Sequence, residues 1–348
     1  MNQPERILIL QLKRIGDVVL TLPVIGVLKK IFPKAKVDFL VEKPADELVR
    51  LNPYIDETLV YEKERSLLWL FEIRRRKYDL VLDFLSNGRS LILTLLSKAR
   101  EKIGFSGPLT RSIVYTRTVK PNTNQFIVEQ KMDLLNGISM LQNQVHFKNW
   151  SWDLNLPSQK LLETKEQLKK EGINYTENLI GFSPAHRRAV RAWIPERFAE
   201  TAESLGKRGF RILFLGGPGE EKYLEKIANN VSANVVIHAA TNLIELSAWI
   251  SFCKILIAND NGPQKIALAL GIPTVTIFGP TDPKSICPND PIHRTIRDEN
   301  LFCIGCQLNR CPYNHECMKN ITAEMALKEI KGLLKNISEA NSAAQISL

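Results

Sequence analysis

The sequence lacks several features that would identify a class of protein at once. Its nearest approach to a long apolar run, residues 18–28, is short and interrupted by Thr21, Pro23 and Gly26, so no membrane span is expected. The N-terminus has no basic, apolar and small-residue series of the signal-peptide kind, which predicts a cytoplasmic protein. Neither GxxxxGK[ST] nor GxGxxG occurs, so neither a P-loop nor a standard dinucleotide site is predicted.

A D-x-D pair, of the kind that holds a divalent cation against a diphosphate, is also missing. In a protein that cleaves a diphosphate, the charge on the leaving phosphate would then be met by arginine, lysine and helix dipoles. The sequence also lacks low-complexity tracts, recognised nucleic-acid modules and aromatic residues interleaved with basic ones. Nucleic-acid binding is therefore the least favoured function.

The 348 residues suffice for two domains of ordinary size, and 44% apolar with 24% charged residues is typical of a globular protein. The net charge is +10, from 47 Lys and Arg against 37 Asp and Glu. This excess suits an anionic partner, such as a membrane surface, a phosphorylated substrate or nucleic acid, but it also fits a solvated basic surface.

Two halves of the chain each alternate strand-like and helix-like segments, which predicts parallel sheets with helices on both faces. In the first half we expect strands at 6–12, 36–41, 57–61, 79–84 and 101–105, with helices between them, the first over 17–32. The rhythm weakens around 110–150, and residues 146–159 are interpreted as a connector. In the second half we expect strands at 178–183, 210–217, 234–238 and around 256, and a last helix at 322–337.

Candidate site residues follow the predicted strands, where ligands of such folds bind. The first segment is LKRIGDVVLTLP, residues 12–23. Gly16 lets the chain turn and Asp17 opens a helix, either as its cap or as a carboxylate able to take a proton from a substrate hydroxyl. The residues alone favour the cap. Lys13 and Arg14 beside it are suited to hold an anion.

The second segment, GFSPAHRRAVRAWIPERF at residues 181–198, places several cations before a helix. Guanidinium groups and helix N–H groups together make a phosphate site. A basic surface loop with a buried tryptophan is an equally good interpretation. The residues concerned are His186, Arg187, Arg188 and Arg191, followed by Trp193 and Pro195.

Two further segments are rich in glycine. In residues 214–227, Gly216, Gly217 and Gly219 allow close backbone approach, while Glu220 and Glu221 favour the helix dipole or accept hydrogen bonds from ribose. In residues 256–283, Asp260 ends a strand and Asn261-Gly262-Pro263 turn the chain into a helix that starts near Gln264. This helix start would receive an anion, and the loop FGPTDP (278–283) could cover a nucleotide; a purely structural turn is the alternative.

Four of the six cysteines, Cys303, Cys306, Cys311 and Cys317, have the spacing C-x2-C-x4-C-x5-C, with His315 among them. In a cytoplasmic chain this spacing indicates a metal site more than disulfides. It lacks the paired CxxC motifs of zinc sites, so a structural zinc and a group of reduced structural cysteines are both open. Cys253 is expected in the core of an apolar strand.

Together these segments resemble the family-9 glycosyltransferases, the heptosyltransferases that build the inner core of lipopolysaccharide. The resemblance is collinear from about residue 5 to 335 and rests on ILILQLKRIGDVVLTLPVIGVLKKIFP, WIPERF, GGPGEEK, ANDNGPQKIALALGIPTVTIFGPTDP and CIGCQLNRCPYNHEC. It implies an α/β protein of the GT-B fold, with two Rossmann-like, doubly wound parallel-sheet domains facing a cleft. Residues 1–155 would bind the acceptor, and helix 322–337 would join them. Residues 156–321 would bind the nucleotide sugar.

The resemblance also implies an inverting, metal-independent transfer of heptose from ADP-heptose to a Kdo or heptose hydroxyl of the lipid-linked core. Asp17 matches the position of the family's general base, and Lys13 and Arg14 would bind the acceptor. No cofactor is needed for catalysis, and the enzyme would work on the cytoplasmic face of the inner membrane. The donor-side residues would be Ser183, Arg191, Glu220, Asp260, Asn261, Gly262 and Lys265.

Two donor-side motifs differ from the family pattern. The usual D-[ST]-G-x-x-H is Asp260-Asn261-Gly262-Pro263-Gln264-Lys265, and Arg191 stands where the family commonly has lysine. Lysine meets a phosphate as a point charge with a reach different from that of histidine. A catalytically silent nucleotide- or glycan-binding protein of the same fold therefore stays open, as does a related transferase with another nucleotide sugar.

Overall fold

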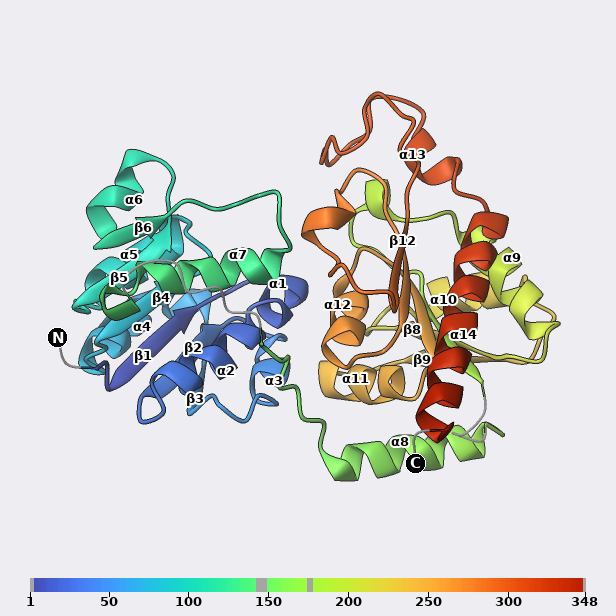
Figure 1. Cartoon of the computed structure of the whole chain (residues 1–348), viewed down its shortest axis with the longest axis horizontal. Helices are drawn as coiled ribbons and strands as arrows, with labels where there is room; N and C mark the ends of the chain where they lie inside the picture. Colours follow the sequence, from blue (N-terminus) through green and yellow to red (C-terminus); the bar gives the residue numbers. More distant parts are fainter. Residues whose placement is uncertain (1–2, 142–148, 174–177, 347–348) are drawn as a thin grey trace. The chain divides into compact units, whose positions relative to one another are not determined.

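The computed structural model describes residues 3–141, 149–173 and 178–346 and divides into two compact units, Met1–Asn155 and Leu156–Leu348. Each unit contains a six-stranded, all-parallel sheet with helices on both faces (Figure 1). The predicted class of two doubly wound, parallel-sheet domains is therefore confirmed. In the expected connector, residues 146–148 lie outside the described residues, and Trp150, Trp152 and Leu154 pack on the first unit's core.

The first sheet has the strand order β3-β2-β1-β4-β5-β6. Apolar residues dominate β1 and β2, as expected for strands that are covered on both faces. The strands are β1 (Arg6–Leu10), β2 (Lys36–Val41), β3 (Glu57–Val60), β4 (Leu80–Asp83), β5 (Glu101–Phe105) and β6 (Arg117–Val119).

The helices of the first unit connect these strands. The expected helix over residues 17–32 is two helices, because the chain turns at Leu20 and Thr21 and Pro23 lies in the first turn of the second. The α-helices are α1 (Ile15–Val19), α2 (Leu22–Ile31), α3 (Asp46–Val49), α4 (Ser66–Arg75), α5 (Gly88–Leu96), α6 (Leu109–Val114) and α7 (Ile127–Asp133). Short 3₁₀ helices are η1 (Lys63–Arg65), η2 (Leu134–Gly137) and η3 (Ser139–Leu141).

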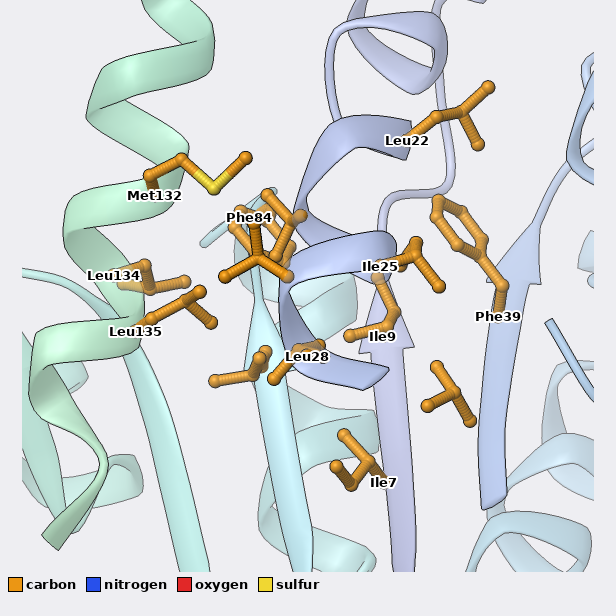
Figure 2. Close-up of a cluster of buried hydrophobic side chains, with 14 of the residues drawn as sticks. Ile7, Ile9, Leu22, Ile25, Leu28, Phe39, Phe84, Met132, Leu134 and Leu135 are labelled. Carbon is orange, nitrogen blue, oxygen red and sulfur yellow. The ribbon is translucent and has the colours of Figure 1, made fainter. Parts of the chain in front are cut away.

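Alternate residues of β1 point to opposite faces of the first sheet. Figure 2 shows one face, where Ile7 and Ile9 lie beneath Ile25 and Leu28 of α2, with Met132 of α7 beside them. On the other face, Leu8 and Leu10 belong to a separate core with residues of α4 and α5. The two cores hold α2 and α7 on one side of the sheet and α4 and α5 on the other.

The second sheet has the order β12-β11-β10-β7-β8-β9, which is the first sheet's order when each unit's strands are counted from one. Its strands are β7 (Leu179–Ser183), β8 (Arg211–Gly216), β9 (Val235–Ala239), β10 (Ile255–Asn259), β11 (Thr274–Ile277) and β12 (His293–Ile296). Its α-helices are α8 (Ser158–Lys170), α9 (Pro195–Gly206), α10 (Glu221–Ala228), α11 (Leu243–Ser251), α12 (Gly262–Ala269), α13 (Glu316–Lys319) and α14 (Ala323–Ile346). Its 3₁₀ helices are η4 (Ala189–Arg191) and η5 (Pro283–Ser285).

The C-terminal helix differs from the sequence expectation. Helix 322–337 was expected to join the first domain, but α14 packs on α9, β11 and β12 of the second unit. Ala326, Ile330 and Leu333 are fully buried in that unit's core. The apolar stripe of α14 therefore covers the second sheet.

Cys253 is buried as expected, but it lies in the turn between α11 and β10 and not in a strand. Among the described residues, no helix combines the length and the apolar character that crossing a bilayer requires.

Candidate functional site

Both sheets reverse their strand order at one place, between β1 and β4 in the first unit and between β7 and β10 in the second. In doubly wound sheets, ligands bind at this point beyond the carboxyl ends of the strands. The loops and helix starts that follow β1, β7 and β10 contain most of the predicted site residues, and each unit therefore has a candidate half-site of its own.

In the first unit, Asp17 is the third residue of α1 and is half-buried. The interpretation of Asp17 as a helix cap is wrong, because the N-cap position belongs to Arg14, and no side-chain capping bond forms at this described helix start. The turn after β1 also does not use Gly16, which is helical; Arg14 takes the positive φ of 62° instead. Lys13 and Arg14 are both exposed in this loop.

Near Asp17 lies a buried lysine that sequence reasoning missed. Lys131 of α7 is 4% exposed, and its ammonium donates to Gln11 Oε1 at 3.1 Å and to Thr21 Oγ1 at 2.9 Å. Burial lowers the pKa of Lys131 to about 8, while the charges of Asp17 and Asp83 oppose this shift. The same Thr21 hydroxyl donates to the Asp17 carbonyl at 2.7 Å, so a hydrogen-bonded path joins Lys131 to the backbone of α1.

Asp83, the last residue of β4, completes this buried group. Its carboxylate accepts hydrogen bonds from Tyr115 Oη at 2.8 Å and from the Ser86 N–H at 2.9 Å. Burial raises the pKa of Asp83, and these hydrogen bonds oppose the rise. A polar residue at the end of an apolar strand, the signal that identified Asp260, would also have identified Asp83. Lys131 had no such signal, because it lies where the strand and helix rhythm weakens.

In the second unit, Asp260 follows β10 and is at the centre of a buried ionic group. Its carboxylate accepts from Lys265 Nζ at 2.6 Å and from Arg191 Nη1 at 3.3 Å. Burial by itself would raise the pKa of Asp260, but Lys265 and Arg191 more than offset this effect and lower it. The structure therefore brings together three of the predicted donor-side residues. Two positive charges face one negative charge, which leaves a net positive charge at the start of α12.

Lys265 is 4% exposed and also donates to Gln264 Oε1 at 2.6 Å. The nearest charged partner of Lys265 is thus a protein carboxylate.

Asn261 joins the loops that follow β7 and β10. It is the N-cap of α12, where its Oδ1 accepts from the Gln264 N–H at 3.1 Å. Its Nδ2 donates to Ser183 Oγ at 3.1 Å and to the Ala185 carbonyl at 3.0 Å. An amide can do both because it carries a donor and an acceptor. Ser183 is buried at the end of β7, and α12 begins at Gly262, two residues before the expected start.

The basic loop after β7 combines features of both interpretations. Trp193 is fully buried and donates from Nε1 to the Ile321 carbonyl at 2.9 Å. His186 Nδ1 accepts from the Arg188 N–H at 2.9 Å, so Nε2 carries the proton and donates to the Asp260 carbonyl at 2.8 Å. Arg187 is exposed. The tryptophan is therefore a core residue, while His186 holds the loop against the Asp260 backbone.

Glu220 lies at the N-cap position of α10 and accepts from the Gly217 N–H at 2.8 Å. This bond closes the glycine turn after β8, in which Gly219 has a φ of +83° that other residues rarely adopt. Glu220 is only partly buried, so its carboxylate remains within reach of a ligand at this strand end.

The four clustered cysteines surround a pocket of about 30 Å³ together with His315. Burial raises the pKa of the Cys317 thiol to about 11, and the other three thiols add to the rise. Across the described part of the chain, no group of three or more His, Cys, Asp or Glu side chains is arranged to hold a metal ion. The thiols therefore share a pocket without forming a ligand set, and the structural zinc stays a prediction.

Comparisons with known proteins agree with this architecture. Residues 70–317 match glycosyltransferase family 9 (heptosyltransferase). The chain is 26% identical to lipopolysaccharide heptosyltransferase 3 of Escherichia coli, over 77% of this chain and 81% of that protein. It is 24% identical to the lipopolysaccharide core heptosyltransferase OpsX of Haemophilus influenzae, over 96% and 97%.

A solved structure described as E. coli ADP-heptose LPS heptosyltransferase II superposes with a TM-score of 0.79 at 19% identity, covering 96% of this chain and 99% of that one. The two Rossmann-like units are therefore those of the GT-B fold. The family match covers more than two thirds of the chain and includes the loops after β7, β8, β10 and β11. The chain belongs to glycosyltransferase family 9, the heptosyltransferases, and is a glycosyltransferase.

Proposed function

We propose that this enzyme transfers a heptose from ADP-heptose to a sugar hydroxyl of the lipopolysaccharide inner core, with inversion at the anomeric carbon. The observation that carries the proposal is the pair of half-sites, one with the half-buried Asp17 carboxylate near a buried lysine and one with a net positive helix start. The names of the related proteins, which specify lipopolysaccharide heptosyltransferases and, in one case, ADP-heptose, support the choice of sugar and nucleotide.

In the first half-site, Asp17 is the general base. Its carboxylate takes the proton of the acceptor hydroxyl while the hydroxyl oxygen attacks the anomeric carbon of the donor. The charge of the buried Lys131 ammonium attracts this carboxylate. Lys13 and Arg14 are exposed beside it and suited to the carboxylate or phosphate groups of a core oligosaccharide.

In the second half-site, the bond between the anomeric carbon and the diphosphate oxygen breaks, and ADP leaves with the electron pair. The charges of Arg191 and Lys265 together exceed that of Asp260 by one, and the positive end of the α12 dipole lies at the same place. These groups stabilise the growing negative charge in a reaction that uses no metal ion. Glu220 is suited to accept from a ribose hydroxyl.

We further propose that the enzyme works in the cytoplasm at the inner membrane, since its acceptor is linked to lipid. The excess of 47 basic over 37 acidic residues would attract it to anionic lipid.

Calorimetric titration with ADP, UDP and GDP, each in the presence of EDTA, tests the donor half of the proposal. We expect ADP to bind at least about tenfold more tightly than the other two, a difference of about 1.4 kcal/mol. We also expect Lys265→Met to weaken ADP binding, because Arg191 and Asp260 then cancel. Tighter binding of UDP or GDP would contradict the ADP-heptose assignment. No nucleotide binding at all would favour a silent protein of this fold.

A further inference from the structure

Three consecutive helices of the first unit expose large apolar side chains that belong to neither half-site. Those of α4 are Leu67, Leu68 and Phe71, which are 70%, 64% and 73% exposed. Those of α5 are Ile92 and Leu95, at 52% and 46%, and those of α6 are Leu109 and Ile113, at 85% and 79%. We name these seven side chains the apolar patch.

The three helices that carry the apolar patch lie side by side. Helix α5 packs against α4 on one side and α6 on the other, as Figure 1 also shows. The inward residues of the same helices, Ile73 and Leu93, are buried against the sheet, so the patch is a second apolar face and not a displaced core. Half of the 14 large apolar side chains that are exposed in the described residues belong to it. Exposed apolar surface of this extent indicates a binding surface.

The positive charge around the apolar patch indicates an anionic partner. Residues 61–120, which contain all three helices, carry 13 Lys and Arg against six Asp and Glu, and thus +7 of the chain's net +10. Exposed basic side chains border the helices at Lys63, Arg65, Arg74, Arg75 and Lys98. Apolar side chains interleaved with basic ones are typical of surfaces that bind anionic membranes. A second copy of the chain would instead bring two equally basic rims together, which like charges oppose.

A groove beside the patch fits the same partner. It lies between α4 and α5, has a volume of about 490 Å³, and is lined by Tyr61, Leu70, Ile92 and Leu93 together with the cations Lys63 and Arg89. Arg89 already pairs with Glu42. An apolar wall beside cationic groups suits a lipid, which presents hydrocarbon next to phosphate.

We infer that α4, α5 and α6 form the surface by which the enzyme docks on an anionic membrane, with the apolar patch inserted among the lipids and the basic rim on their phosphates. The inference rests on the proposed function in one respect: a lipid-linked acceptor explains why a transferase needs such a surface. It goes beyond that function because it assigns docking to seven named side chains.

Sedimentation with vesicles of phosphatidylcholine and phosphatidylglycerol tests the inference on the full-length protein. We compare Leu68→Ser/Phe71→Ser with the matched control Leu162→Ser/Phe302→Ser, which changes exposed side chains of the second unit. Wild type and control should bind these vesicles, bind pure phosphatidylcholine less, and bind less in high salt. The patch variant should bind about tenfold more weakly, since two inserted side chains are lost.

Equal vesicle binding by the patch variant and wild type would overturn the inference, and so would failure of wild type to bind. A wild-type dimer that becomes monomeric in the patch variant, measured by light scattering, would assign the patch to a second copy and overturn it too. Calorimetric ADP binding separates this question from the proposed function, because the patch lies on helices outside both half-sites. If wild type binds vesicles but not ADP, the proposed function fails while the docking surface stands.

Discussion

At the scale of single residues, each half-site contains a lysine that is buried beside a carboxylate. The charge of Lys131 interacts with those of Asp17 and Asp83, and Lys265 pairs with Asp260. Placing an ammonium in a dry environment costs free energy that its partners must offset. Such groups are retained where a charge is needed at a defined place, and both lysines adjoin the residues that the proposed chemistry uses.

The depressed pKa of Lys131 predicts how its contribution to stability varies with pH. Its pKa is about 8 in the folded protein against 10.5 for an ordinary lysine. Between these values the unfolded chain binds more protons than the folded one, so stability rises with pH. We expect the free energy of unfolding of wild type to increase relative to Lys131→Met by about 2 kcal/mol between about pH 8 and 10. Urea unfolding at several pH values measures this difference.

Lys169→Met is the control for this prediction, because Lys169 is an exposed lysine of α8. The difference in the free energy of unfolding between Lys169→Met and wild type should not change over the same pH range. If the difference for Lys131→Met were also constant, Lys131 would not be the buried cation described here.

At the scale of elements, Asn261 has two roles at the start of α12. It caps this helix, and it holds the loop after β7 by hydrogen bonds. We expect Asn261→Ala to lower the free energy of unfolding by about 1–2 kcal/mol and to weaken ADP binding, because the cap and the bonds to the β7 loop are lost together. Asn261→Ser should restore the cap and part of the stability. Urea unfolding and ADP titration of the same samples measure both effects.

Asn242 provides a matched control, because it caps α11 in the same unit by accepting from the Glu245 N–H at 2.8 Å. Asn242→Ala should also lower the free energy of unfolding, through the loss of its cap, but should have no effect on ADP binding. Equal loss of ADP affinity in the two variants would mean that the loss comes from general destabilisation.

Sequence predicted the elements whose apolar pattern is strong and local. Strands β1, β7 and β10 are short apolar runs in the sequence. The residues that follow these runs include Asp260 and the loop before Asp17, which is how both were identified. It did not predict α6, β6, α7 or β12, where short elements are amphipathic or polar and are held by tertiary packing. Lys131 was missed for this reason, since its role depends on α7 crossing the end of β1.

At the scale of the whole molecule, each unit has its own buried core, and α14 belongs to the second. We therefore expect the fragment 156–348 to fold alone and to bind ADP, because the proposed donor residues all lie within it. The fragment 156–321 lacks α14, which uncovers part of the core, and should unfold at a lower urea concentration. Circular dichroism during urea unfolding measures this, and identical midpoints for the two fragments would contradict the placement of α14.

The prediction for α14 failed at this scale because an amphipathic stripe shows that a helix must cover something apolar, without showing which sheet it covers. The same limit applies to the cysteines, whose spacing indicated a shared site while their arrangement in space depends on the whole segment from β12 to α13.

The most direct test of the central claim is heptose transfer by wild type and Asp17→Asn. The assay uses ADP-heptose and a core oligosaccharide acceptor ending in Kdo or heptose, with EDTA present. We expect transfer by wild type, and a rate at least about 100-fold lower for Asp17→Asn with unchanged ADP affinity, because the amide cannot accept the proton. Wild-type turnover by a folded Asp17→Asn enzyme would contradict the assignment of Asp17 as the general base.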